Sequence, residues 1–153
     1  MIEKYMQQAL DLAKQAANLG EVPVGALVVQ GDRIIGRGFN QKEGSQCVTR
    51  HAEIIAIEEA CKALGSWRLP GCSLIVTLEP CLMCAGATYQ ARFDHVYFGC
   101  SDPKFGALGS LYTINGDIRL NHRFQVTSGI LALASTELLK DFFRKKRSST
   151  DPR

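Results

Sequence analysis

The chain has 153 residues, of which 46% are hydrophobic and 22% charged, a composition that excludes a disordered, fibrous or multi-domain protein and predicts one globular domain. Roughly 70% of the surface of an unfolded chain of this length is buried on folding, so a stable fold requires neither disulfides nor oligomerisation. A bound metal ion would therefore be expected to take part in catalysis rather than to stabilise the fold. The net charge is +3, and the excess lies in residues 140–153, which hold six basic residues against Asp141 and Asp151. Such a basic end is either a solvated helix end or a contact for a partner that carries phosphates.

Residues 1–20 carry acidic side chains and apolar residues at helical spacing, without the apolar run and cleavage site of a signal peptide. No run approaches the ~18 apolar residues of a membrane span. We therefore expect a cytoplasmic protein with no membrane partner. In a reducing compartment, clustered cysteines more often bind a metal or catalyse than form disulfides. Of the six cysteines, only Cys81 and Cys84 are clustered.

The hydrophobic pattern predicts a helix, a hairpin, and then alternating helices and strands. In chain order we expect a helix ending at Gly20, strands at 25–30 and 33–40 joined by a tight turn, a polar loop at 41–50, a helix from about His51 to Gly65, a strand at 73–78, a helix after Pro80, a strand at 95–100, a turn-rich loop at 101–110, a short strand at 124–128 and a helix at 130–147. Alternation implies parallel pairing, and the hairpin adds antiparallel strands. The predicted fold class is α/β, a three-layer α/β/α arrangement with a central mixed five-stranded sheet.

Two predicted helix starts carry side chains that bind metals. His51 opens one helix, and Cys81 and Cys84 lie on the first turn of another. In open α/β sheets the strand-to-helix turns line the crevice where ligands bind, so the two starts can converge. The positive end of a helix favours the thiolates that a metal prefers. Two sulfurs and one nitrogen suit Zn²⁺, with the fourth position left for water, as in catalytic zinc.

Glu53 follows His51 by two residues and therefore lies on a different side of the helix start. There it can face a water molecule on the metal without binding the metal, as a proton shuttle. A structural zinc would need a fourth protein ligand, for which Cys100 or His95 is available, although both border a strand and also suit an ordinary core. Taken singly, each of these motifs is common. Together, at two helix starts with a strand between them, they favour a catalytic zinc.

The HxE and PCxxC pair is the signature of zinc nucleobase deaminases. The chain further resembles the bacterial tRNA-specific adenosine deaminases, which have a cytidine deaminase-like fold. The matching segments cover most of the chain: VPVGALVV at 22–29, GFN at 38–40, RHAEI at 50–54, TLEPCLMCAGA at 77–87, SDPKFGALGSL at 101–111, NHR at 121–123 and DFFRKKR at 141–147. The resemblance implies one zinc deaminase domain at residues 1–147, with 148–153 as a disordered tail.

The resemblance also implies a homodimer that converts the wobble adenosine of a tRNA anticodon to inosine, with one zinc per chain on His51, Cys81 and Cys84. Glu53 would transfer protons at the flipped-out adenine. Asn40 would hydrogen-bond the purine or its ribose, although it also suits an ordinary turn at the end of a strand, and the backbone N–H of Ala52 would fix the base.

Contacts to a single-stranded anticodon loop need aromatic faces and cations. Phe143 and Arg144 on the last helix provide both, and Asp102 and Lys104 resemble the family's substrate-facing loop. The alternative for this last pair is a turn Asp beside a solvated Lys.

One segment departs from the family pattern. Residues 47–50 read Cys-Val-Thr-Arg where relatives commonly have Asp-Pro-Thr-Ala, which puts the shape and charge of the adjoining pocket rim in question. We expect Cys47 to be a packed small hydrophobic residue. Two other functions remain open: a deaminase of a free nucleobase or nucleotide, which the basic end argues against, and a non-catalytic zinc-stabilised RNA-binding module, which Glu53 argues against.

Overall fold

The computed structural model describes residues 1–150, with side chains described through Ser148. Its elements are α1 (Ile2–Asn18), β1 (Gly25–Gln30), β2 (Arg33–Phe39), α2 (Lys42–Ser45), α3 (Ala52–Leu64), β3 (Cys72–Leu78), α4 (Leu82–Gln90), β4 (His95–Cys100), a 3₁₀ turn (Ile114–Gly116), β5 (Gln125–Thr127) and α5 (Ala132–Thr150). Within residues 1–150, no helix has the length and apolar content to cross a membrane.

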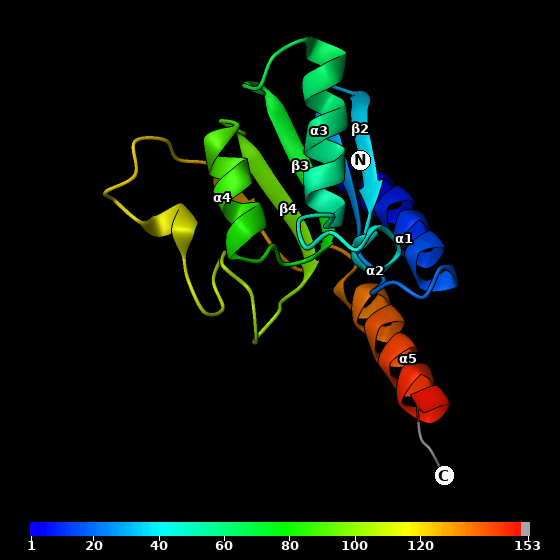
Figure 1. Cartoon of the computed structure of the whole chain (residues 1–153). Coiled ribbons are helices and arrows are strands. Elements are labelled where there is room, and N and C mark those ends of the chain that lie inside the picture. The colour runs from blue at the N-terminus through cyan, green and yellow to red at the C-terminus, as the bar shows by residue number, and fades with distance from the viewer. Residues whose placement is uncertain (151–153) are drawn as a thin grey trace.

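The five strands form one mixed sheet in the order β2-β1-β3-β4-β5 (Figure 1). β1 pairs antiparallel with both β2 and β3, whereas β3, β4 and β5 pair in parallel. The β1–β2 hairpin turns at Gly31, whose φ of 63° is left-handed, a conformation that glycine adopts without strain. The predicted mixed five-stranded sheet is confirmed.

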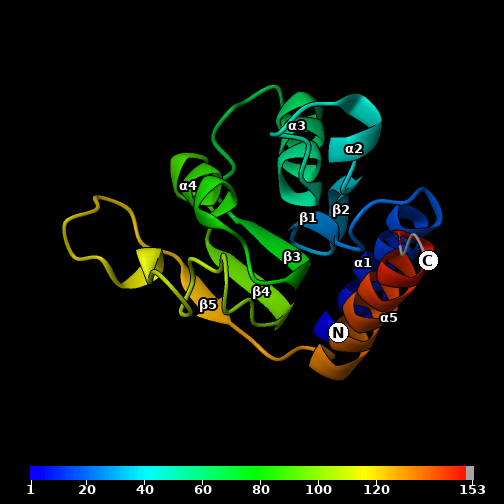
Figure 2. The ribbon, with the colours of Figure 1, turned by 60° about the horizontal axis from the view of Figure 1, so that its bottom comes forward.

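Helices cover both faces of this sheet, with α1 and α5 on one side and α3 and α4 on the other (Figure 2). Successive residues of a strand point to opposite faces, and on β1 Leu27 and Val29 pack with α1 while Ala26 and Val28 pack with α3. β3 alternates in the same way, with Ile75 on the α1 side. The two buried clusters that result confirm the three-layer arrangement.

The segment expected to be a polar loop contains a short helix, α2. Glu21, which is 3% exposed, accepts hydrogen bonds from the backbone N–H groups of Glu43 and Gly44 at 3.0 and 2.7 Å. A carboxylate that binds two free N–H groups stabilises a helix start. Because Glu21 lies 22 residues from Glu43, local sequence patterns do not reveal this helix.

The last helix is longer than the sequence predicted. α5 continues to Thr150, so the tail expected to begin at residue 148 starts inside a helix, and residues 151–153 lie outside the described residues. Asp141 pairs with Arg144 and with Lys145 one turn later. Such pairs, with basic residues near the C-terminal end, stabilise a helix.

Candidate active site

The helices α3 and α4 begin at the same edge of the sheet. β2 and β3 run in the same direction because each is antiparallel to β1. His51 immediately precedes α3 and Cys81 immediately precedes α4. The topology therefore brings together two helix starts that are 30 residues apart in the sequence.

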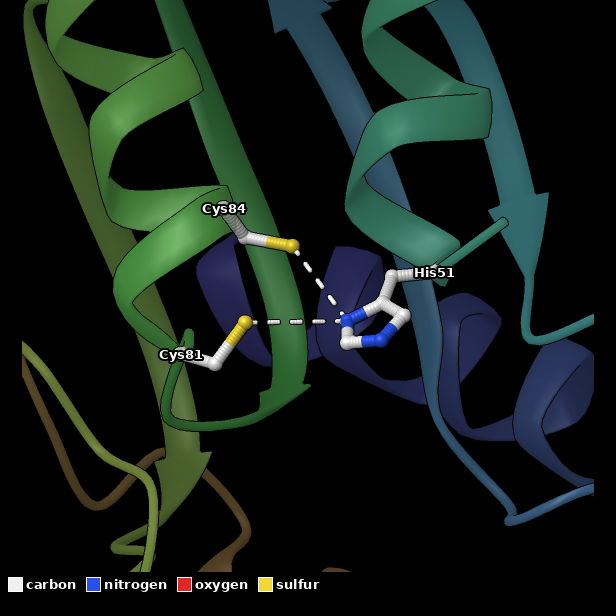
Figure 3. Close-up of side chains that lie close together, drawn as sticks. All are labelled: His51, Cys81 and Cys84. Atoms are coloured by element: carbon white, nitrogen blue, oxygen red, sulfur yellow. Dashed lines mark hydrogen bonds between the residues drawn. The ribbon is translucent and has the colours of Figure 1, made fainter. Parts of the chain in front are cut away.

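The side chains of His51, Cys81 and Cys84 point toward one another from these helix starts (Figure 3). Nδ1 of His51 lies 3.7 Å from Sγ of Cys81 and 3.6 Å from Sγ of Cys84. All three ligand atoms lie within 4.8 Å of one another, and no other such group of His, Cys, Asp and Glu side chains occurs among the described residues. We call these three residues the metal cluster.

The spacing of the metal cluster fits a zinc ion. Zinc binds histidine nitrogen at about 2.05 Å and cysteine sulfur at about 2.3 Å, so tetrahedral geometry separates nitrogen from sulfur by about 3.6 Å. The observed separations of 3.6 and 3.7 Å match this value. The donor set of two sulfurs and one nitrogen is also one that zinc prefers.

Neither candidate for a fourth protein ligand belongs to the metal cluster. Nε2 of His95 hydrogen-bonds Oγ1 of Thr127 at 2.8 Å, and the His95 ring stacks on Tyr97 at 3.9 Å. The thiol of Cys100 donates to the carbonyl oxygen of Thr77 at 3.9 Å. Three protein ligands are typical of catalytic zinc sites, which leave one position open.

The two thiols of the metal cluster hold their protons unequally. Hydrogen bonds from the Cys84 thiol and from His51 lower the pKa of Cys81 to about 4, against the opposing effect of burial. The same thiol–thiol hydrogen bond, together with burial, raises the pKa of Cys84. The hydrogen bond with Cys81 also raises the pKa of His51. Cys81 is therefore a thiolate at neutral pH, the form that binds metals.

Glu53 lies on the first turn of α3 and is 4% exposed. Burial, the largest effect, raises the pKa of its carboxyl group to about 7, and a hydrogen bond with Cys84 partly opposes this rise. The carboxyl group is therefore beside the metal cluster without belonging to it. A group whose pKa lies near neutrality can both accept and return a proton.

Asn40 and Ala52, the two residues predicted to bind a base, contact each other. The backbone N–H of Ala52 donates a hydrogen bond to Oδ1 of Asn40 at 2.8 Å. This bond fixes the Asn40 amide and leaves its Nδ2 group as the donor for a ligand. Asn40 follows β2 and Ala52 opens α3, so both lie at the edge of the sheet that carries the metal cluster.

Asp102 and Lys104 lie in the loop after β4. The Asp102 carboxylate accepts hydrogen bonds from the backbone N–H groups of Lys104 at 3.1 Å and Phe105 at 3.2 Å. These hydrogen bonds form an Asx turn, as expected if Asp102 is an ordinary turn residue. The side chains of Lys104 and Phe105 are exposed, and sequence reasoning did not single out Phe105.

Phe143 and Arg144 lie on α5, which extends beyond the edge of the sheet at which α3 and α4 begin (Figure 1). The Phe143 side chain is 42% exposed and packs edge-on against Phe142. Arg144 pairs with Asp141. Neither residue belongs to the metal cluster, and both lie on an accessible face.

The expectation that Cys47 is packed in the interior is wrong. Cys47 is exposed, its Sγ lies 3.3 Å from Oγ1 of Thr49, and this hydrogen bond lowers the pKa of its thiol. Val48 is 72% exposed, and Arg50 pairs with Glu58 of α3 at 2.6 Å.

Glu79 is a residue of this region that sequence reasoning missed. It follows β3, two residues before Cys81, and is only 2% exposed. Its carboxylate accepts hydrogen bonds from the loop at 102–110. The signal available in the sequence was an acidic residue directly after the apolar strand SLIVTL, where a buried charge requires several hydrogen-bond donors.

Comparison with known proteins places this geometry among deaminases. Residues 2–147 match the MafB19-like deaminase family. The chain is 48% identical over 145 residues to a tRNA-specific adenosine deaminase of Bacillus subtilis (strain 168), covering 95% of this chain and 90% of that protein. A structure from a study of A-to-I editing by tRNA:A34 deaminases aligns with a TM-score of 0.86 at 43% identity, over 89% of this chain and 99% of that one. A guanine deaminase from Bacillus subtilis aligns with a TM-score of 0.63 at 40% identity, over 65% and 64%.

Proposed function

This chain belongs to the MafB19-like deaminase family, and from that premise we propose that it hydrolyses adenosine to inosine at the wobble position of a tRNA anticodon. One observation carries the proposal. The metal cluster and the buried carboxyl group of Glu53 lie together in a chain 48% identical to a tRNA-specific adenosine deaminase.

His51, Cys81 and Cys84 would hold one zinc ion per chain. When bound, zinc in a site of this type lowers the pKa of a water molecule and makes it nucleophilic at neutral pH. Because the three protein ligands leave one tetrahedral position open, the metal cluster suits this use.

Glu53 would move the protons of the reaction. It takes a proton from water as the water oxygen bonds to C6 of adenine, and delivers that proton to N1 of the ring. The remaining proton of the attacking water then passes from the oxygen on C6 through Glu53 to the amino group, the C6–N bond breaks, and ammonia leaves. The oxygen stays on C6 as the carbonyl of inosine. A carboxyl group with a pKa of about 7 suits both directions of transfer.

Asn40 would hold the flipped-out adenosine at this edge of the sheet, whereas the backbone N–H of Ala52, expected to bind the base, instead fixes the Asn40 amide. The Oδ1 atom of Asn40 is occupied by the N–H of Ala52, so Nδ2 of Asn40 donates to an acceptor atom of the purine or its ribose. Asp102 and Lys104 would contact the adjoining anticodon loop. Phe143 and Arg144 would supply a stacking face and a cation for the RNA.

We also propose that the protein is a homodimer that meets its tRNA in the cytoplasm. Helix α4 contains no charged residue, and its Leu82 is 50% exposed. Leu111 and Tyr112 are 56% and 53% exposed. They lie close to the start of α4, because the N–H of Leu111 donates a hydrogen bond to the carbonyl oxygen of Gly106, and Gly106 forms a β-bridge with Cys81. A second copy of the chain would cover this apolar face.

The decisive experiment is incubation of the purified, zinc-loaded protein with bulk tRNA, followed by digestion to nucleosides and detection of inosine. We expect inosine in the digest and, on sequencing of the copied tRNA, a base change confined to the wobble position, with neither seen for Glu53→Gln as the matched control. Absence of inosine with a zinc-loaded protein would refute the proposal.

A second candidate function is deamination of a free purine base, which the 40% identity to a guanine deaminase favours. Such an enzyme would release ammonia from guanine without tRNA. The basic end of α5 argues against it, because a free base carries no phosphate. A non-catalytic RNA-binding module is disfavoured by Glu53, since a structural zinc site has no use for a buried carboxyl group beside it.

A further inference from the structure

Glu79 binds the loop at 102–110 through both of its carboxylate oxygens. Oε1 accepts hydrogen bonds from the backbone N–H of Asp102 at 3.0 Å and from the hydroxyl of Ser110. Oε2 accepts from the backbone N–H groups of Leu108 at 3.0 Å and Ser110 at 3.1 Å. Four donors from both ends of one loop thus converge on a single side chain that is 2% exposed.

The middle of the same loop is shaped to fit this carboxylate. A Cβ atom at Gly106 would lie 2.3 Å from Cδ and 2.4 Å from each oxygen of Glu79. No side chain fits at that distance, so the loop passes over the carboxylate at a residue without one. The loop therefore encloses Glu79 on three sides: at its start, its middle and its end.

This arrangement also fixes the loop next to the metal cluster. Gly106 pairs with Cys81 as an antiparallel bridge, and the N–H of Ala107 donates to the carbonyl oxygen of Pro80 at 2.9 Å. The outer part of the loop carries Lys104, which is exposed, and Phe105, which is 66% exposed. A cation and an aromatic face side by side are what a single-stranded nucleic acid binds.

We propose that Glu79 is a positioning residue that holds the loop at 102–110 in the conformation that presents Lys104 and Phe105 to the anticodon loop. This inference rests on the proposed function and assigns it a determinant of RNA binding. Glu79 acts through backbone amides and touches neither the substrate nor the metal ligands' side chains. Its loss should weaken RNA binding while the metal cluster stays loaded.

Glu79→Gln tests this with little change in shape. The substitution replaces one acceptor oxygen by an NH₂ donor, and each oxygen receives two hydrogen bonds, so at least one backbone N–H then faces another donor. We expect the Kd of an anticodon stem-loop RNA, measured by fluorescence anisotropy on zinc-loaded protein, to rise at least about tenfold, because the loss of a single base stacked on Phe105 has an effect of about that size. The amides of Leu108 and Ser110 should exchange hydrogen faster, and bound zinc should stay the same.

Asp94→Asn is the matched control, because it also removes one negative charge and alters a carboxylate that accepts a backbone N–H, that of Gly71. Asp94 lies before β4, at the opposite edge of the sheet from the metal cluster. The Asp94→Asn variant should therefore bind the anticodon stem-loop RNA with the same Kd as the parent protein. Removal of a negative charge by itself favours RNA binding, so a weaker complex cannot come from charge.

Gly106→Ala keeps the carboxylate but displaces it from the loop, and should weaken RNA binding as Glu79→Gln does. An unchanged Kd for Glu79→Gln, or loss of its zinc, would overturn the inference while leaving the proposed function intact. A parent protein that forms no inosine in tRNA would overturn both.

Discussion

At the scale of single residues, the chemistry depends on which side chains are buried beside the metal cluster. Glu53 is 4% exposed, and burial raises its pKa to about 7, whereas hydrogen bonds lower the pKa of Cys81 to about 4. The site therefore has one acid near neutrality, suited to carrying protons, next to one thiolate, suited to binding a metal.

Glu53→Gln should keep zinc and RNA binding but reduce inosine formation at least ~10²-fold, the contribution of a general acid–base residue. The amide has the same shape as the carboxyl group but cannot accept and return a proton. Single-turnover rates on tRNA, with zinc content measured on the same sample, check this. If the variant bound no zinc, Glu53 would be a ligand and the assigned role would be wrong.

Cys84→Ala should lose zinc and activity together, because two of three protein ligands hold zinc far less tightly than three. Cys72→Ala is the control. Cys72 is also buried but lies at the start of β3, away from the metal cluster, and its variant should keep about one zinc per chain. Metal analysis of both purified variants decides the ligand assignment, and full retention of zinc in Cys84→Ala would refute it.

At the scale of elements, close contact between β2 and α3 sets the position of the metal ligand His51. A Cβ at Gly38 would lie 2.3 Å from the carbonyl oxygen of Ala52, and one at Gly36 would lie 2.1 Å from that of Ala56. Helix α3 thus rests directly on the backbone of β2. Its first turn, which carries Glu53, has little freedom to move.

Gly38→Ala should destabilise the protein by about 1–3 kcal/mol or more, the cost of overpacking, and should also weaken zinc binding because the start of α3 must shift. Lys62→Ala is the control, since Lys62 lies exposed in the last turn of the same helix and alanine is a good helix former. Urea unfolding and zinc titration measure both effects. Equal zinc affinity in the two variants would contradict the coupling.

Helix α5 carries the basic excess of the chain. Its Phe143 is 42% exposed, and Arg144 and Lys145 pair with Asp141 on the same helix. An aromatic ring and cations on one helix end allow two separate contributions to RNA binding, stacking and charge.

Phe143→Ala should cost ~1–3 kcal/mol of RNA binding if a base stacks on the ring, with almost no change in salt dependence. Deletion of residues 143–153 should in addition flatten log K against log salt by roughly two units through the loss of about three basic contacts, since each phosphate contact to a single strand contributes about −0.7. Anisotropy titrations over a range of salt concentrations separate the two. A truncated protein with unchanged affinity and slope would show that this helix end is only solvated.

At the scale of the whole molecule, apolar side chains remain exposed on one face. Leu82, Leu111 and Tyr112 are each at least half exposed, and α4 contributes no charge to this face. Cys81 and Cys84 of the metal cluster lie at the start of α4, so a partner subunit bound to this face would lie close to the metal cluster.

Leu82→Asp should convert the homodimer to a monomer, because a charge at the centre of an apolar interface loses its hydration without gaining a partner. Leu133→Asp is the control on α5, where the side chain is 78% exposed and outside this face. Sedimentation velocity at several protein concentrations distinguishes the two states. A parent protein that is monomeric at all concentrations would refute the dimer.

The sequence by itself determined the order of the elements apart from the short helix α2, the mixed sheet and the three members of the metal cluster. These features rest on local patterns: apolar spacing that differs between helix and strand, and cysteines three residues apart at a helix start. The direction of the strands follows from the same pattern, because a hairpin followed by strand–helix alternation permits few topologies. His51 and Cys81 were therefore expected to meet although 30 residues separate them.

Only the tertiary structure decided how residues far apart in the chain satisfy one another. Glu79 binds a loop that begins 23 residues later, and Glu21 binds α2 from 22 residues away. Asn40 accepts a hydrogen bond from Ala52, and Cys47 is exposed. The first three of these outcomes depend on which polar group finds which donor. That choice is made when the elements pack, because a buried charge must be satisfied by whatever donors the fold brings to it, and residue spacing does not encode it.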